Sequence, residues 1–307
     1  MNRKTTFWIT AALIIATVLY LLMVAVPEQA VSVKPNPVTV DPSEKGLAFE
    51  EFVITPEDAD LAVHGWWMPA AEPIASLVFI HGGGSNRNST FFGSLDFYHA
   101  LVERNVSVAA IDLRNHGNSD SDGQGLQFGR TEKYDAMAAT AWTRARQPGL
   151  PVYIMGISMG GATVIQAVSS GAKVDGLILL DPLLNTDDVF KRGGWVETGL
   201  PDILFSLSSW SARTFFGLPD GEDQALVRAA SLDVPILAMQ DPDDPVTRLS
   251  YTQQLVASNP KAILWLAPPI PSNDPQLAWK GRWGSHVAAF QFFPEAVLES
   301  IMQFMKR

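Results

Sequence analysis

The sequence lacks cysteine altogether and is poor in basic residues. The absence of cysteine over 307 residues excludes disulfides, thiol nucleophiles, cysteine-ligated zinc and iron–sulfur clusters. Basic residues number 22 against 32 acidic ones, so the formal net charge is −10. Because such a chain repels phosphate, nucleic acid is not expected as a partner. The chain is nevertheless 47% hydrophobic and only 18% charged, which excludes disorder throughout.

A long uncharged run lies near the N-terminus. Residues 7–26 contain no charge, follow Arg3 and Lys4, and are closed by Pro27. A helix of this length spans about 30 Å, the thickness of one hydrocarbon core. We therefore predict a transmembrane helix at 7–26. Residues 1–6 are expected in the cytoplasm, because Arg and Lys next to a span are retained on that side.

A cleaved signal peptide is the alternative for this segment. Signal peptides have a shorter apolar run and small residues at positions −3 and −1 of the cleavage site. Cleavage after Ala25 would place Met23 at −3, and cleavage after Ala30 would place Glu28 there. We therefore favour an uncleaved single-pass anchor in the cell membrane. The rest of the chain is then extracytoplasmic, in the periplasm if the cell is Gram-negative.

Beyond the anchor, the sequence predicts a linker and one large domain. Residues 27–48 hold four prolines and are typical of a linker, and the domain occupies 49–307. There, apolar strands alternate with helices, which indicates an α/β fold with a mostly parallel sheet covered on both faces. Residues 182–231 interrupt the alternation and are expected to form a small helical cap. The predicted strands are 49–55, 63–68, 77–80, 106–111, 152–155, 177–180, 236–240 and 263–266, and the predicted helices are 95–103, 133–146, 159–169, 247–258 and 294–306.

The segment Gly156-Ile157-Ser158-Met159-Gly160 has the pattern G-x-S-x-G between a predicted strand and a predicted helix. A sharp strand-to-helix turn holds its serine in strained backbone and exposes the hydroxyl. The flanking glycines permit the close backbone approach of such a turn. The pattern therefore predicts Ser158 as a nucleophile. The alternative is a glycine-rich helix start with a capping serine.

A glycine-rich loop, His81-Gly82-Gly83-Gly84, follows the predicted strand at 77–80. Without side chains in the way, backbone N–H groups there reach a developing oxyanion. We predict an oxyanion hole formed by the N–H of Met159 and that of Gly83, with Gly82 as second choice. A phosphate cradle is the competing interpretation, but no Gly-Lys-Ser/Thr follows. His81 itself is expected to be structural.

The base and the acid follow from chain order. In a strand–elbow–helix arrangement the triad runs serine, acid, histidine. His286 is the only histidine after Ser158 and is therefore the predicted base. For the acid we favour Asp244, which lies in a D-P-V-T segment leading into a helix. Asp241 is the second candidate and Asp181, after the strand at 177–180, is the third.

Together these residues resemble the α/β-hydrolase superfamily over residues 49–307. The segment 112–119, Asp-Leu-Arg-Asn-His-Gly-Asn-Ser, resembles the family's D-x-R-x-H-G-x-S loop. The resemblance implies that this loop is structural and that His116 is not catalytic. Two features depart from the family pattern. Gln240 and Asp241 replace the glycine usual before the acid loop, and a long stretch precedes the catalytic histidine.

The resemblance implies a membrane-anchored serine hydrolase that cleaves an ester-type bond through an acyl-enzyme. It implies no metal and no organic cofactor, and a small-molecule ester or lipid-like substrate. A peptidase of the same fold and a non-catalytic binding protein are the alternatives, and the oligomeric state stays open. Tryptophans in the cap and in the stretch 267–283 are expected to roof an apolar pocket, or else to pack the cap onto the sheet; they are Trp195, Trp210, Trp279 and Trp283.

Overall fold

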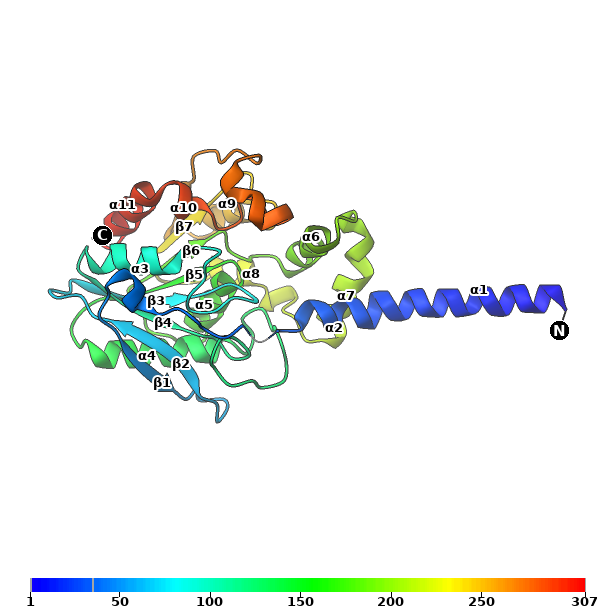
Figure 1. Cartoon of the computed structure of the whole chain (residues 1–307), viewed down its shortest axis with the longest axis horizontal. Coiled ribbons are helices and arrows are strands. Elements are labelled where there is room, and N and C mark those ends of the chain that lie inside the picture. The colour runs from blue at the N-terminus through cyan, green and yellow to red at the C-terminus, as the bar shows by residue number, and fades with distance from the viewer. Residues whose placement is uncertain (1, 35, 307) are drawn as a thin grey trace.

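An eight-stranded sheet forms the centre of the computed structural model, which describes residues 2–34 and 36–306 (Figure 1). The strand order is β1-β2-β4-β3-β5-β6-β7-β8. β2 pairs antiparallel with β1 and β4, and the pairs from β4 through β8 are parallel. The bounds are β1 (Glu50–Ile54), β2 (Val63–Met68), β3 (Ala75–Ile80), β4 (Val106–Ile111), β5 (Val152–Ile157), β6 (Gly176–Leu180), β7 (Ile236–Gln240) and β8 (Ala262–Leu266).

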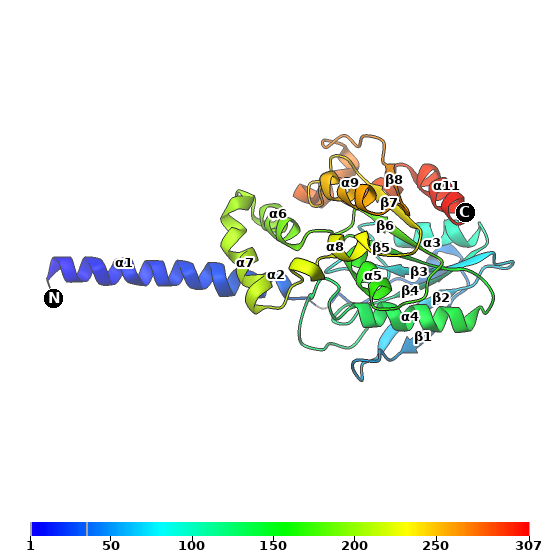
Figure 2. The same ribbon diagram turned by 180° about the vertical axis from the view of Figure 1, so that it is seen from behind.

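Helices cover both faces of this sheet (Figure 2). β3, β4 and β5 are buried at every position, which is why they are continuous apolar runs rather than alternating ones. The predicted α/β-hydrolase fold with a mostly parallel sheet is confirmed. One face packs against α4 (Lys133–Arg146), α5 (Met159–Ser169), α8 (Ala225–Ala230) and α9 (Leu249–Ser258), and the other against α3 (Ser94–Val102), α10 (Ala289–Phe292) and α11 (Pro294–Phe304).

The segment between β6 and β7 is helical, as expected for 182–231. It contains α6 (Thr186–Thr198), a 3₁₀ turn (Asp202–Phe205), α7 (Ser206–Phe215), a second 3₁₀ turn (Gly221–Asp223) and α8. Asn185 caps α6 by accepting a hydrogen bond from the Asp188 N–H at 2.9 Å, and Gly199, in left-handed backbone, ends the helix. α6 and α7 lie at the end of the domain from which the N-terminal helix projects (Figure 1).

The N-terminal helix is longer than the sequence predicts. α1 (Arg3–Tyr20), a π-helical turn (Leu21–Ala25) and α2 (Val26–Val31) follow one another without a break. The expectation that Pro27 closes the helix is therefore wrong. Proline has no N–H to donate four residues back, to the carbonyl of Met23. The hydroxyl of Ser211 in α7 donates to that carbonyl instead, so a tertiary contact supplies the missing hydrogen bond.

The segment predicted as a linker, 27–48, lies against the domain at both of its ends. The side chain of Val31 is buried in the core, and its carbonyl accepts a hydrogen bond from the Leu126 N–H at 2.7 Å. A 3₁₀ turn (Pro42–Lys45) precedes Leu47, which is buried on the opposite face of the sheet. The start of the domain is thus attached to the end of the N-terminal helix.

Candidate active site

Ser158 occupies a sharp turn between β5 and α5. Its backbone has φ 52° and ψ −119°, a conformation that L-residues rarely adopt. The neighbouring glycines make the turn possible, because a Cβ on Gly156 would lie 2.2 Å from the Gly160 carbonyl oxygen. A Cβ on Gly160 would lie 2.3 Å from the Ile80 carbonyl oxygen. The predicted strand–turn–helix arrangement is present and projects the serine from the carboxyl end of the strand.

Three predicted residues from three loops meet at this turn. His286 Nε2 lies 2.9 Å from Ser158 Oγ, and His286 Nδ1 lies 2.6 Å from Asp244 Oδ2. The other oxygen of Asp244 accepts hydrogen bonds from the N–H groups of Val246 and Thr247, at 2.6 and 2.8 Å. The carboxylate is therefore fixed and selects the imidazole tautomer with its proton on Nδ1. The Nε2 lone pair then faces the serine hydroxyl.

The other two candidate acids do not bond to the His286 ring. Asp241 Oδ1 accepts the N–H of Asp243 at 3.0 Å. Asp181 Oδ1 accepts the N–H of Asp241 at 2.7 Å, and its Oδ2 accepts the N–H of Val287 at 3.0 Å. Asp181 thus ties the acid loop to the histidine loop. Burial, together with the charge of Asp244, raises the pKa of Asp181 well above its ordinary value.

Gln240, which stands near the position of the family's usual glycine, has a structural role of its own. Its buried side chain accepts a hydrogen bond from the Thr252 hydroxyl at 2.7 Å. Its amide N–H₂ donates to Asp181 Oδ1 at 3.1 Å and to the Asp241 carbonyl at 3.1 Å. The larger residue therefore organises the acid loop that follows β7. The signal available in the sequence was a polar residue ending an otherwise apolar strand.

The predicted oxyanion loop packs directly on the serine turn. A Cβ on Gly82 would lie 3.3 Å from Ser158 Cβ, and one on Gly83 would lie 3.3 Å from Met159 Sδ. Met159 is the first residue of α5, where a helix leaves its N–H groups without intrahelical acceptors. The N–H of Gly83 donates to no other residue that the structure describes. Both N–H groups are available to an oxygen bound beside Ser158.

Two neutral histidines support this loop from behind. His81 bridges the Gly82 carbonyl, at 2.7 Å, and the Leu113 N–H, at 3.1 Å. His116 Nε2 accepts the N–H of Gly84 at 3.1 Å. Burial lowers the pKa of His81 to about 4 and that of His116 to about 3, so both rings are uncharged at neutral pH. Their contacts agree with the structural role expected for both.

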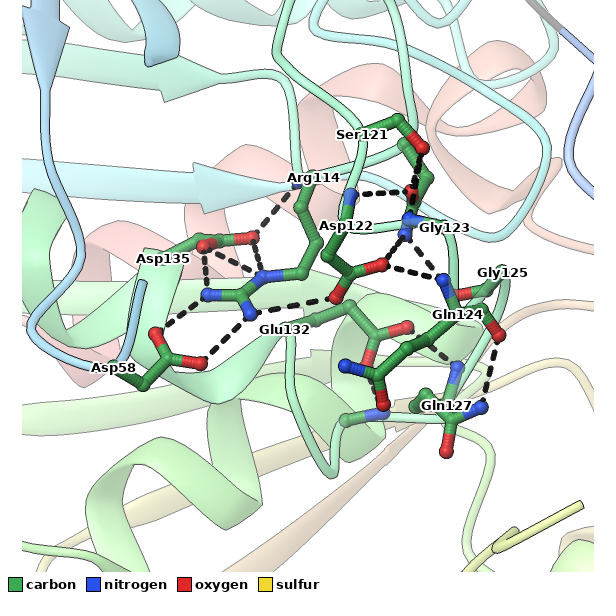
Figure 3. Close-up of polar contacts among 12 residues, drawn as sticks. Asp58, Arg114, Ser121, Asp122, Gly123, Gln124, Gly125, Gln127, Glu132 and Asp135 are labelled. Atoms are coloured by element: carbon green, nitrogen blue, oxygen red, sulfur yellow. Dashed lines mark hydrogen bonds and ion pairs between the residues drawn. The ribbon is translucent and has the colours of Figure 1, made fainter. Parts of the chain in front are cut away.

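The rest of the 112–119 loop is anchored by ion pairs (Figure 3). The buried guanidinium of Arg114 lies 2.7 Å from Asp135 and 2.8 Å from Asp58. A Cβ on Gly117, whose φ is +53°, would lie 2.1 Å from Asp112 Oδ2, so only glycine fits there. These contacts agree with the structural role expected for the loop.

Residues 77–300 match the family described as the alpha/beta hydrolase family. The chain belongs to this family. It superimposes on the esterase Pf2001 of Pyrococcus furiosus with a TM-score of 0.71, at 22% identity, over 90% of this chain and 97% of that one. This likeness to the esterase shows the shared fold.

Curated relatives of this chain include lipases. It is 26% identical over 120 residues to the monoglyceride lipase of Homo sapiens, over 39% of this chain and 38% of that protein. It is 26% identical over 195 residues to the lysophosphatidylserine lipase ABHD12 of Macaca fascicularis, over 62% of this chain and 47% of that protein. The chain thus spans about a third to a half of the length of such relatives.

A cavity of about 810 Å³ lies at this site, and Ser158 is among its lining residues. Trp279 and Trp283 line it, as expected, whereas the cap tryptophans Trp195 and Trp210 are not among the described residues that do. The cap contributes phenylalanines, smaller apolar residues and glycines instead, together with the polar Glu197 and Thr198. The N-terminal helix also forms part of the wall, which the sequence did not predict. Cap and helix residues at the cavity include Ala25, Val26, Gln29, Ala30, Phe190, Gly193, Gly194 and Phe205.

The side chains of Asp181, Asp244 and His286 also satisfy the spacing of a metal site. Their ligand atoms lie within 4.8 Å of one another. Both oxygens of each carboxylate, however, already accept hydrogen bonds from protein N–H groups. A cation bound between Asp244 and the facing Nδ1 of His286 would have to displace the proton that joins these two groups, so the donor set fits positioning of the imidazole better than metal binding.

Proposed function

We propose that the protein is a serine hydrolase that cleaves carboxylic esters through Ser158, His286 and Asp244. The observation that carries the proposal is the unbroken hydrogen-bonded line from Ser158 Oγ through both ring nitrogens of His286 to Asp244. It is supported by a serine held in strained backbone at a helix N-terminus, which is typical of the exposed nucleophile of this fold.

The reaction then has two halves. Ser158 Oγ attacks the ester carbonyl while His286 Nε2 takes the hydroxyl proton, and the carbonyl oxygen becomes an oxyanion. The N–H groups of Met159 and Gly83, with Gly82 as the second choice for the loop, stabilise that charge. His286 returns the proton to the leaving alcohol as the C–O bond breaks. Water, activated by the same ring, then hydrolyses the acyl-enzyme and frees the carboxylic acid.

The substrate class follows from the cavity. Its wall is mostly apolar, with Phe190, Phe205, Trp279 and Trp283 around the reacting groups. Such a wall favours an ester with an apolar acyl or aryl group. The lipase relatives support the same class. We therefore propose a lipid-like ester as the substrate.

We also propose that the N-terminal helix is a membrane anchor. The helix from Arg3 to Val31 is long and apolar enough to cross a bilayer, and its most apolar stretch is unburied. With Arg3 and Lys4 inside, the domain at 49–307 lies outside the cytoplasm and 27–48 connects the two. A phosphatase reporter fused to the C-terminus is expected to be active in the extracytoplasmic space. A mature protein that begins after residue 25 or 30 would instead identify a cleaved signal peptide.

A panel of p-nitrophenyl esters of increasing chain length tests the proposed activity. The purified full chain is expected to hydrolyse them, with kcat/KM rising from acetyl to medium-chain esters. Ser158→Ala, which keeps the turn but removes the nucleophile, is expected to lose the activity. Hydrolysis that survives in Ser158→Ala, or no hydrolysis by the parent, would contradict the proposal.

A further inference from the structure

We propose that the cavity opens at the bilayer surface beside the N-terminal helix, and that the enzyme takes its ester directly from the membrane. The surface that contacts the bilayer is an apolar patch on the cap. This inference rests on the proposed ester hydrolysis and on the helix spanning the membrane. It adds the route by which the substrate reaches Ser158.

The first observation is that the proposed membrane-spanning helix also forms part of the cavity wall. Its C-terminal end, at Ala25 and Ala30, lines the same cavity as Ser158. That end cannot swing away freely, because the Ser211 hydroxyl bonds to the Met23 carbonyl and the Leu126 N–H bonds to the Val31 carbonyl. A lipid that lies alongside the helix in the bilayer is therefore already next to the cavity wall.

The second observation is a length deficit. The helix is unpacked from Phe7 to Leu21, and α7 packs against the turn that begins there. These fifteen residues span about 22 Å at about 1.5 Å each, against a hydrocarbon core of about 30 Å. Such a mismatch is met by thinning of the bilayer, by snorkelling of the flanking Arg3 and Lys4, by oligomerisation, or by neighbouring apolar protein that enters the bilayer. The cap, whose α7 packs against the end of the free helix, is the part placed to enter.

The third observation is that the cap carries the apolar surface required. The cap patch lies on α7 and on the connection from α6, at the end of the domain from which α1 projects (Figures 1 and 2). α7 carries part of the patch and packs on the turn at Leu21–Ala25, so the patch lies next to the end of the free helix. Tryptophan at such a position is typical of a membrane interface. The exposed residues of the patch are Leu200, Ile203, Leu204, Trp210 and Phe215.

The absence of cysteine permits a direct test of contact with lipid. Leu204→Cys in the patch and Ile74→Cys at the amino end of β3 each create a unique labelling site, and the two native residues are 52% and 49% exposed. Each full-length variant is labelled with bimane and reconstituted into dioleoylphosphatidylcholine vesicles that contain doxyl-labelled lipid. We expect strong quenching at position 204 and little at 74. Equal quenching at both, or none at 204, overturns the proposal. Disulfide crosslinking of the unlabelled Leu204→Cys protein, with no quenching of the labelled one, would assign the patch to a second copy of the chain.

Activity separates this inference from the proposed function. Ile203→Glu charges the patch without touching the cavity lining, and Ile74→Glu is the matched control. We expect Ile203→Glu to lower the hydrolysis of 1-oleoylglycerol in vesicles at least tenfold and to leave that of water-dissolved p-nitrophenyl butyrate within twofold. If the parent cleaves neither ester, the proposed function fails. If the parent cleaves both and Ile203→Glu leaves their ratio unchanged, access from the membrane fails while the hydrolase stands.

Discussion

The candidate active site and the end of the domain that bears α1 differ in how well their side chains are covered and paired. At the carboxyl ends of the strands, Ser158, Asp244 and His286 are held by short hydrogen bonds in a buried and partly strained backbone. At the end that bears α1, the structure leaves large apolar side chains uncovered. In the first region the side chains satisfy one another, so their geometry indicates a reaction. In the second region the apolar side chains lack a covering surface, so they indicate that the protein lies on a membrane and takes its substrate from it.

The largest effect is expected in the first region. Asp244→Asn keeps the size of the side chain but no longer holds the Nδ1 proton of His286, so the ring presents the wrong tautomer to Ser158. We expect kcat to fall by about four orders of magnitude for short and long esters alike. Steady-state kinetics on p-nitrophenyl esters measure this, with circular dichroism to verify folding. A loss confined to long esters would show that Asp244 acts on access rather than chemistry.

A smaller effect is expected from the residue that links the loops. Asp181→Asn loses one of two acceptors that join Asp241 to Val287, a buried hydrogen bond of about 1–3 kcal/mol. We expect kcat to fall about tenfold to a hundredfold, with KM little changed. Asp241→Asn, in the acid loop beside Asp244, is the control and should have a smaller effect than Asp244→Asn. If Asp241→Asn is the most damaging of the three, Asp241 and not Asp244 is the acid.

The access region is expected to change selectivity instead. Trp283→Ala removes an aromatic wall from the cavity, whereas Trp195→Ala, in the cap but outside the lining, is the control. We expect Trp283→Ala to change the ratio of kcat/KM between long and short esters by about 1–3 kcal/mol. Trp195→Ala should leave the ratio unchanged. A Trp283→Ala enzyme with an unaltered ratio and a lower Tm would mean that the tryptophan only packs the fold.

The smallest effect concerns pH. Because the folded pKa of His116 is about 3, the unfolded chain binds its proton first as pH falls below about 6.5, and the folded state loses stability there. His116→Gln keeps an acceptor for the Gly84 N–H but removes this titration. The variant should be less stable than the parent at pH 7. The gap should narrow by up to about 1.4 kcal/mol per pH unit below 6.5. Urea unfolding at several pH values measures it, and a constant gap would contradict a neutral buried ring.

Features that depend on local sequence patterns could be predicted, whereas features that depend on tertiary contacts could not. Strands such as 106–111 are continuous apolar runs, and their structural bounds agree with those expected. Ser158, Asp244 and His286 could be predicted because the connectivity of this fold sets the order of nucleophile, acid and base along the chain. The end of the N-terminal helix does not follow from local signals. Pro27 is a helix breaker by itself and is accommodated here by a hydroxyl from the distant α7.

The roles of Asp181 and Gln240 escaped prediction for the same reason. Each acts by hydrogen bonds to loops that are adjacent in space but not in sequence. The wall that α2 contributes to the cavity is likewise a tertiary contact. Local patterns identify which residues have catalytic chemistry, whereas the residues that position and enclose them become visible only when the strands are brought together.

Reaction with a fluorophosphonate tests the central claim most directly, because the reagent forms a covalent bond only with an activated serine. We predict that the full-length protein is labelled at one site, that mass spectrometry identifies it as Ser158, and that Ser158→Ala and His286→Ala are not labelled. A parent protein that does not react, or a folded Ser158→Ala variant that still does, would contradict the account of this site as a serine hydrolase.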